Sequence, residues 1–428
     1  MSDIKLVDVS IRDGNQSIWS ATGLNTAQTL QIAPVMDRIG LQAIDFTSST
    51  HMGVCVRTHK QNPWTLIRGM RSAAPHTPLQ FITTGFRFIS WETSDPEFMR
   101  LAYRTLVING ISRFALIDPM HDRHALLAGA RMIRQEGGEV LAGLTYTISS
   151  VHDDEFYASL AGALAASPDV SRLYIKDPTG LLTPERARTL IPAVRARIGT
   201  KALELHSHCT IGLAPLTYMT AAELGIDVLH VACGPLANGT SLPDARRVVA
   251  NLRELGHTVD VHDASLERAA GYFASLADAE GLPAGAPQEY DAAFLRHQLP
   301  GGAITTTIRQ LEELNLSDRL PAVIEETIRV RAELGYPIMY TMEMQGHLVV
   351  SGLAEQGPAA RAGVRPGDLI LQVAGEPVSG LAHLFRSIWR LGPVGTDVPL
   401  TLARGGAQPE VRVRSADRND FLRKPLRH

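Results

Sequence analysis

Residues 172–208 read RLYIKDPTGLLTPERARTLIPAVRARIGTKALELHSH, and this stretch decides the fold class. Its two ends, 172–177 and 202–208, are short apolar or β-branched runs that finish in polar residues, as buried parallel strands do. The segment between them, 184–199, is amphipathic and is expected to be a helix. The stretch therefore predicts one β–α–β unit, in which the helix returns the chain so that the two strands run parallel.

The same pattern occurs along most of the N-terminal part of the chain. Further strand-like runs lie at residues 5–10, 43–49, 78–85, 113–118, 140–149 and 228–234. Amphipathic segments such as 26–40, 96–110 and 216–226 alternate with them. Eight strands alternating with helices predict an α/β fold, the (β/α)8 or TIM barrel, whose active site is built at the carboxyl ends of the strands. An open doubly wound sheet is the alternative, but no GxGxxG turn follows the first run.

Beyond the eighth strand candidate the pattern changes twice. Helical patterns first occupy residues 264–282, 305–315 and 320–335, with a Pro-Gly-Gly break at 300–302. These helices predict an extension of the barrel domain. The last part of the chain then predicts a strand, a short helix, two strands, a helix and a hairpin, which together make a small β-rich domain.

Charge supports a domain boundary near Gln345. Residues 346–428 carry 11 Lys/Arg and 7 Asp/Glu, a net charge of +4, whereas the whole chain has a net charge of −3. Such a shift is typical of a change of domain. We therefore expect a barrel over residues 1–275, a helical extension over 276–345 and a β-rich domain over 346–428.

Composition excludes several classes of protein. The 428 residues are 45% hydrophobic and 20% charged, as expected for a globular protein with a full core. The small net charge gives no reason to expect binding to nucleic acid or to an anionic membrane. We expect no membrane span, because no run approaches about 18 apolar residues, and MSDIKLVDVS is no signal peptide. Cys55, Cys209 and Cys233 are too few for a disulfide framework, so we expect a cytoplasmic protein.

Polar residues end three of the predicted strands. His206 and His208 are two residues apart, so both imidazoles point to one face of a strand. Asp13 follows the first strand and would join them if the first and seventh strands end on the same rim of a closed barrel. Two imidazoles and a carboxylate predict a site for a first-row metal. A polar strand end bonded to water and backbone is the alternative for the two histidines alone.

Lys176 ends the sixth predicted strand and allows three interpretations. In the first, its ammonium group faces solvent or pairs with Asp177. In the second, it is a neutral amine ready for Schiff-base chemistry. In the third, CO2 carbamylates it and turns it into an anionic oxygen ligand. An ammonium cannot ligate a metal and would be repelled by one. The lysine alone does not choose among the three.

Together these segments resemble a known family. IRDGNQS (11–17) resembles the opening motif of the DRE-TIM metallolyases. YIKDPTGLLTP (174–184) and LELHSH (203–208) closely resemble segments of the carboxyltransferase domain of pyruvate carboxylase and of the oxaloacetate decarboxylase α subunit. The likeness continues, in order, through residues 62–80, 227–243, 299–306 and 335–341. It covers roughly residues 4–342 and implies a TIM barrel with a helical funnel at its mouth.

The resemblance also implies a metal site. It assigns a divalent metal, zinc or manganese, to Asp13, His206, His208 and a carbamylated Lys176. Such a metal polarises a carbonyl and stabilises an enolate. Acyl-CoA lyases and Claisen-type synthases of the wider group usually have a small residue in place of Lys176, so the lysine favours carboxyl transfer over carbon–carbon cleavage.

Substrate and biotin roles follow from the same resemblance. It implies that Arg12 and Gln16 hold a small keto acid, and that Thr305 moves a proton to or from the biotin of a carboxylated carrier. A salt bridge at the barrel rim is the alternative for Arg12, and a helix N-cap is the alternative for Thr305. Thr84 stands where the family has an arginine, and Arg87 is a candidate substitute; both are expected to line the substrate site.

Two further positions depart from the family pattern. Cys209 follows the second histidine where the family has an aspartate, so a carboxylate behind the metal ligands is missing. We expect Cys209 to be a packed residue and not a nucleophile. Ala303 replaces the glutamine of the family's PGGQ motif. These changes put pyruvate and oxaloacetate as the substrates in question.

PAARAGVRPGDLILQVAGEPV (358–378) resembles a bacterial PDZ domain of the HtrA-protease kind. PDZ domains bind a peptide C-terminus by adding a strand to a sheet edge. The usual first strand and carboxylate-binding loop are not evident; MYTMEMQG (339–346) would have to serve. A dimerisation element and a passive cap are therefore alternatives to peptide binding.

The leading hypothesis is a metal-dependent carboxyltransferase or decarboxylase acting on a small keto acid or related carbonyl acid. Because this sequence has no MKM biotinylation motif and no ATP-grasp domain, the biotin carboxyl carrier and biotin carboxylase would be separate chains. One alternative is a metal-dependent aldolase or lyase of the same superfamily. Another is a non-catalytic scaffold working through its PDZ-like module. A homodimer is expected.

Overall fold

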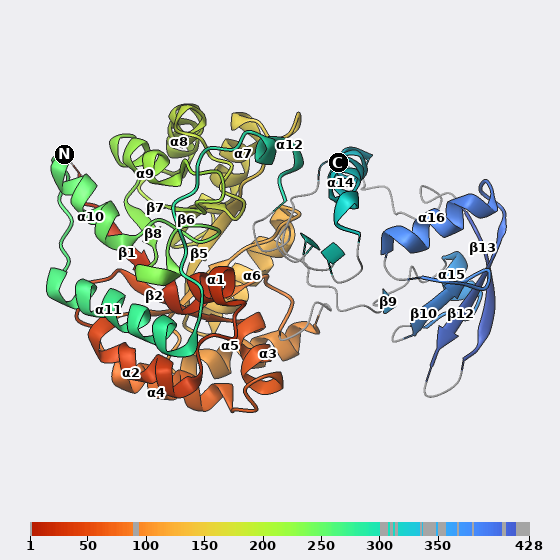
Figure 1. Cartoon of the computed structure of the whole chain (residues 1–428), viewed down its shortest axis with the longest axis horizontal. Helices are drawn as coiled ribbons and strands as arrows, with labels where there is room; N and C mark the ends of the chain where they lie inside the picture. Colours follow the sequence, from red (N-terminus) through yellow and green to blue (C-terminus); the bar gives the residue numbers. More distant parts are fainter. Residues whose placement is uncertain are drawn as a thin grey trace. The chain divides into compact units, whose positions relative to one another are not determined.

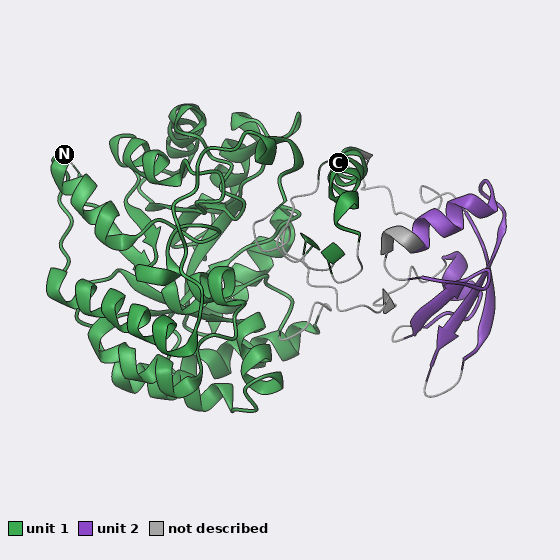
Figure 2. Cartoon of the chain, viewed as in Figure 1, with its two compact units in different colours: residues 1–341 green, residues 342–428 purple. Residues whose placement is uncertain are grey.

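A computed structural model describes residues 2–88, 94–299, 307–308, 311–312, 316–333, 336, 348–349, 357–365, 368–378, 381–404 and 408–416. The chain forms two compact units, Met1–Thr341 and Met342–His428 (Figure 2). Apolar clusters in the first unit and a separate cluster in the second show that each unit has a core of its own.

Eight parallel strands close into a barrel in the first unit (Figure 1). They are β1 (Lys5–Asp8), β2 (Ala43–Ser48), β3 (Leu79–Thr83), β4 (Arg113–Leu116), β5 (Glu139–Thr145), β6 (Arg172–Asp177), β7 (Leu203–Ser207) and β8 (Val228–Val231). Their order around the barrel follows the sequence, and β1 pairs with β8. The predicted TIM barrel is confirmed, and the doubly wound alternative is excluded.

The register between β6 and β7 places the polar residues at the ends of these two strands at one level. Lys176 on β6 is the partner of His206 on β7, and Asp177 is the partner of Ser207. The strands are almost entirely buried, as apolar parallel strands covered on both faces must be. The carboxyl ends of β6 and β7 therefore present their polar residues together at the same rim.

Amphipathic helices surround the barrel (Figure 1). The longer ones are α2 (Thr26–Met36), α4 (Pro63–Ala73), α5 (Pro96–Ile108), α6 (Arg123–Gln135), α7 (Asp154–Ala165), α8 (Pro184–Ile198), α9 (Ala214–Glu223), α10 (Ala245–Glu254) and α11 (Asp263–Glu280). Local sequence sets their starts: Asn25 and Gln28 form a capping box at α2, and the Thr183 hydroxyl caps α8 ahead of Pro184.

Further helices of the first unit lie around the strand ends and beyond the barrel. They are α1 (Asn15–Trp19), α3 (Ser49–Arg57), α12 (Ala293–His297) and α14 (Leu320–Glu333). Of the predicted helical extension, α11 and α14 are confirmed, whereas most of residues 305–315 lies outside the described residues. Among the helices that the structure describes, none has the length and apolarity needed to cross a bilayer.

The second unit contains a five-stranded antiparallel sheet in the order β11–β10–β12–β13, with β9 beside β10. Its elements are β9 (Leu348–Val349), α15 (Pro358–Arg361), β10 (Leu369–Val373), β11 (Glu376–Pro377), α16 (Leu381–Leu391), β12 (Asp397–Ala403) and β13 (Glu410–Arg414). This is the predicted order of strand, short helix, two strands, helix and hairpin.

Candidate metal centre at the carboxyl-terminal rim of the barrel

A short π-helical turn, Ser10–Gly14, follows β1 and carries two of the predicted site residues. Its widened geometry is seen in the 3.0 Å bond from the Gly14 N–H to the carbonyl of Val9, five residues back. Turns of this kind are frequent at functional sites. Gly14 has no room for a side chain, because a Cβ there would lie 2.8 Å from the carbonyl oxygen of Leu236. The buried turn places Asp13 at the rim.

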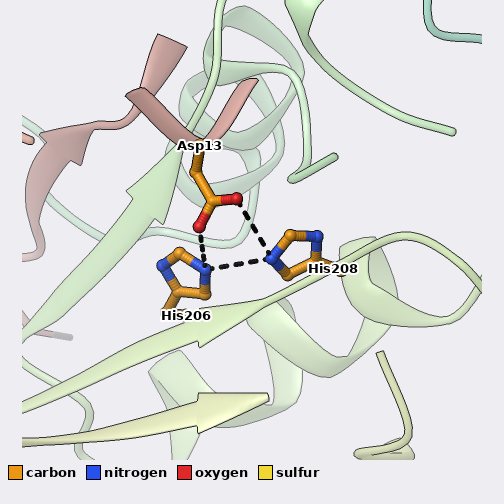
Figure 3. Close-up of side chains that lie close together, drawn as sticks. All are labelled: Asp13, His206 and His208. Atoms are coloured by element: carbon orange, nitrogen blue, oxygen red, sulfur yellow. Dashed lines mark hydrogen bonds and ion pairs between the residues drawn. The ribbon is translucent and has the colours of Figure 1, made fainter. Parts of the chain in front are cut away.

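Asp13, His206 and His208, here called the triad, converge at this rim (Figure 3). Asp13 Oδ2 lies 3.1 Å from His206 Nε2, and Asp13 Oδ1 lies 3.6 Å from His208 Nε2. The two Nε2 atoms are 3.2 Å apart. Among the described residues, no other group of three or more His, Cys, Asp or Glu side chains is arranged closely enough to share a cation.

The triad is chemically suited to a divalent metal. All three side chains are buried, and their ligand atoms face one another and not water. One carboxylate and two imidazoles form a donor set typical of zinc and other first-row metals. A shared cation would satisfy lone pairs that these atoms cannot all satisfy among themselves.

Lys176 lies within the same cluster. Its Nζ is 3.2 Å from Asp13 Oδ2 and 2.9 Å from His206 Nε2. Burial lowers the pKa of Lys176, and the neighbouring Asp13 carboxylate opposes that shift. Asp177 points elsewhere and accepts hydrogen bonds from the Ser207 hydroxyl and from backbone N–H groups. The solvent-facing and Asp177-paired interpretations of Lys176 are therefore wrong.

His208 is oriented by the backbone around it. Its Nδ1 is 2.6 Å from the carbonyl oxygen of Thr240, so this nitrogen carries the proton and donates it. Nε2 then keeps its lone pair and directs it at the triad. The loop after β6 packs tightly here: Gly180, at φ +73°, could not carry a Cβ, which would lie 2.3 Å from the carbonyl oxygen of His208.

Arg12 is held between two carboxylates. Its Nη1 is 2.7 Å from Asp13 Oδ2, its Nε is 3.0 Å from Asp45 Oδ2, and its Nη2 also contacts Asp45. Burial alone would raise the pKa of Asp13, but Arg12 and Lys176 hold it well below its usual range. Arg12 thus forms the salt bridge of the alternative interpretation, and its role in holding a keto acid stays a prediction.

The remaining predicted site residues are not joined to the triad. Gln16 lies on α1 and is half-buried; Thr84 and Arg87 follow β3 at the same rim and are also half-buried. Within the described part of the chain, none of the three forms a hydrogen bond or ion pair with the triad. Thr305 lies outside the described residues.

Cys209 is buried beside His208, and burial raises the pKa of its thiol. Its backbone N–H donates to the Ser241 carbonyl at 2.7 Å. A thiol with a raised pKa forms little thiolate, the nucleophilic species, so the environment opposes a nucleophilic role.

Sequence reasoning missed Asp45 and a polar chain inside the barrel. His230 Nδ1 lies 3.1 Å from His206 Nδ1, and His230 Nε2 lies 3.0 Å from Glu204 Oε2. A signal for Glu204 was present, because it precedes His206 by two residues and so shares its face of the strand. His230 could have been noticed as a polar residue in the apolar run 228–231.

Comparison with known proteins identifies related sequences. Residues 294–341 match the family described as "conserved carboxylase domain", and residues 349–404 match "PDZ domain". A pyruvate carboxylase subunit of Methanocaldococcus jannaschii is 31% identical over 343 residues, which cover 80% of this chain and 60% of that protein. The 2-oxoglutarate carboxylase large subunit of Hydrogenobacter thermophilus is 26% identical over 424 residues, 97% of this chain and 62% of that protein.

Solved structures share the fold. The carboxyl transferase domain from Rhizobium etli pyruvate carboxylase with 3-bromopyruvate superposes with a TM-score of 0.74 at 22% identity, over 79% of this chain and 58% of that one. The chain spans about 60% of the length of the curated relatives described above. The first unit is thus similar in sequence to pyruvate carboxylase subunits and in fold to a pyruvate carboxylase carboxyl transferase domain, and residues 349–404 match a PDZ domain.

Proposed function

We propose that the first unit is a metal-dependent carboxyltransferase or decarboxylase. It would move a carboxyl group between biotin on a separate carrier protein and a small keto acid or a related carbonyl acid. The convergence of Asp13, His206, His208 and Lys176 at the rim of the barrel carries the proposal. The relatives' names, pyruvate carboxylase and 2-oxoglutarate carboxylase, support 2-keto acids as the substrate class.

The triad would hold zinc or manganese, with a carbamylated Lys176 as the fourth ligand. The metal would supply a Lewis acid that polarises the substrate carbonyl and stabilises charge on its enolate form. Carbamylation joins the lysine nitrogen to CO2 and releases one proton, and it needs the uncharged amine. The buried position of Lys176 favours that amine, because burial disfavours an ammonium group.

Arg12 and Gln16 would hold the substrate carboxylate, with Asp45 fixing the direction of the Arg12 guanidinium. Thr84 would replace the family's arginine in lining the substrate site, and Arg87 would supply the positive charge. Thr305 would move the proton to or from the biotin ureido nitrogen. This different set of polar groups near β3 is expected to give a substrate preference distinct from that of pyruvate carboxylases.

Biotin carboxylase and biotin carboxyl carrier subunits are proposed as separate partner chains, and a homodimer as the assembly. The cysteines Cys55, Cys209 and Cys233 are all buried free thiols. Free thiols persist in a reducing compartment, so we propose a cytoplasmic location.

Decarboxylation with free biotin as a carrier substitute tests the proposal. Manganese-loaded protein is mixed with oxaloacetate or oxalosuccinate, with and without biotin, and release of pyruvate or 2-oxoglutarate is followed. We expect biotin to stimulate release, Asp13→Ala to abolish it, and replacement of the exposed Asp3 by alanine to leave it unchanged. Metal-loaded protein without biotin-stimulated release from either acid would overturn the proposal, and biotin-independent cleavage of a hydroxy acid would favour the lyase alternative.

A further inference from the structure

A continuous chain of polar side chains lies inside the barrel behind His206. His206 Nδ1 is 3.1 Å from His230 Nδ1, and His230 Nε2 is 3.0 Å from Glu204 Oε2. Glu204 in turn contacts Arg113 Nη2. These four side chains are each at most 1% exposed, so water does not compete for their hydrogen bonds.

Hydrogen-bond directions in this chain can be assigned from its far end. Glu204 forms ion pairs with Arg113 and, at 3.4 Å, with Arg172, so it is a carboxylate with no proton to donate. His230 Nε2 must therefore be the donor to Glu204. Because two guanidinium groups already balance the Glu204 charge, a third buried cation at His230 would be uncompensated and costly. His230 is accordingly neutral, and its Nδ1 is an acceptor.

The direction of the last bond then follows. With His230 Nδ1 as an acceptor, His206 Nδ1 must carry a proton and donate it. A neutral His206 has no second N–H, so its Nε2 holds a lone pair directed at Asp13, His208 and Lys176. His208 reaches the same tautomer independently, through its Nδ1 and the carbonyl of Thr240.

The framework around His230 fixes the plane of its ring. Tyr174 stacks on His230 with ring centroids 5.7 Å apart and an interplanar angle of 13°. The residues concerned come from β4, β6, β7 and β8, four strands of the closed barrel. Groups that orient the ligands of a metal in this way commonly tune its affinity.

We propose that His230, held by Glu204, is a positioning residue that keeps His206 in the Nδ1–H tautomer with its Nε2 lone pair aimed into the triad. The consequence for metal affinity rests on the proposed metal site. The tautomers themselves are properties of the metal-free chain and can be measured without any metal.

The direct test is nitrogen NMR of the full chain labelled with 15N-histidine, prepared free of metal. Single substitutions of the three histidines assign their signals. We expect Nδ1–H tautomers for His206 and His208 and the opposite, Nε2–H, tautomer for His230. An Nε2–H tautomer at His206, or an Nδ1–H tautomer at His230, would overturn the proposal.

A matched pair of variants tests the consequence. In His230→Gln, the amide can accept from His206 through its oxygen and donate to Glu204 through its nitrogen, whereas His230→Leu can do neither. We expect manganese affinity to fall about 10–100-fold in His230→Leu and to stay within roughly threefold of wild type in His230→Gln. His262→Leu is the control, because His262 precedes α11 as its N-cap residue and belongs neither to the triad nor to the chain from His206 to Glu204.

The outcomes separate this proposal from the proposed function. If wild-type protein binds no manganese or zinc, the metal site fails, and the tautomers still decide the positioning of His206. If the tautomers are as expected but His230→Leu binds metal as wild type does, the positioning role is wrong while the metal site stands. An equal loss of manganese affinity in His230→Leu and His230→Gln, with both variants melting at the wild-type temperature, would also contradict the positioning role of His230.

Discussion

Lys176 Nζ lies 2.9 Å from His206 Nε2, and the two residues are register partners on adjacent parallel strands. The same Nζ lies 3.2 Å from Asp13 Oδ2. Strand pairing, and not a mobile loop, thus places the lysine among the predicted metal ligands. A permanent ammonium here would oppose a cation, so the chemical state of Lys176 determines what the triad can bind.

Removing one imidazole of the triad should remove the metal. His208→Ala leaves Asp13 and His206 as donors besides Lys176. We expect manganese or zinc affinity to fall at least ~100-fold, because loss of a ligand should cost more than loss of a residue that only orients a ligand. Metal content after dialysis, measured by mass spectrometry, checks this. His262→Ala is the control for loss of a histidine elsewhere. Equal metal content in His208→Ala and wild type would show that the site lies elsewhere.

Asp45 is expected to support both stability and substrate binding through Arg12. Asp45→Asn keeps the shape but removes a charge that faces the buried guanidinium, so we expect the free energy of unfolding to fall by about 1–3 kcal/mol. In the proposed reaction KM for the keto acid should rise more than kcat falls, because the guanidinium loses its fixed direction. Asp278→Asn on the exposed face of α11 is the control. An unchanged KM would show that Asp45 does not position Arg12 for substrate binding.

The second unit should contain its own acid-sensitive ion pair. Arg404 donates to both oxygens of Asp368, at 2.6 and 2.7 Å, and these bonds lower the pKa of Asp368 from 3.8 to about 2. A lowered pKa in the folded state stabilises the unit above the ordinary pKa, and this contribution is lost as the pH falls toward 2. Asp368→Asn should cost about 1.5–3 kcal/mol at neutral pH.

Hydrogen exchange of peptides from residues 357–404, followed in the full chain, measures that effect. After correction for intrinsic exchange rates, wild-type protection should fall between pH 4 and pH 2, whereas protection of Asp368→Asn should change less over this interval. Parallel pH profiles for the two proteins would contradict the assignment of the pair.

The barrel unit should function as a metal-binding domain without the PDZ unit. The two units have separate apolar cores, so a chain ending at residue 345 is expected to fold and to bind manganese with wild-type affinity. Calorimetric titration and a melting curve check this. Loss of folding in the shortened chain would show that the PDZ unit is structural, and loss of the expected dimer alone would identify it as the assembly element.

The fold could be predicted because each strand is a separate local signal. Runs such as 172–177 and 228–234 are apolar or β-branched, and their alternation with amphipathic helices admits few architectures. The ends of the elements are weaker local signals: the run 140–149 predicts one strand, but β5 ends at Thr145. Beyond that point the chain leaves the sheet, and the Thr147 hydroxyl and Ile148 N–H bond to the side-chain oxygen of Gln298 instead.

The site was predicted only in part. His206, His208 and Asp13 were found because barrel closure brings the ends of β1 and β7 to one rim. Asp45 and His230 are visible as polar residues in the neighbouring strands β2 and β8, but the sequence does not show which side chains they contact. Such contacts join residues far apart in the sequence, and neither local propensity nor periodicity encodes them.

The most direct test of the proposed function is the effect of bicarbonate on manganese binding at Lys176. Free manganese is measured by electron paramagnetic resonance for wild type and Lys176→Ala, in CO2-free buffer and with bicarbonate. We predict that bicarbonate tightens binding by wild type at least ~10-fold, because a carbamate replaces a repelled ammonium with an anionic ligand. Lys176→Ala should bind weakly in both buffers. Wild-type affinity in Lys176→Ala, with no effect of bicarbonate on either protein, would contradict carboxyl transfer at a carbamylated lysine.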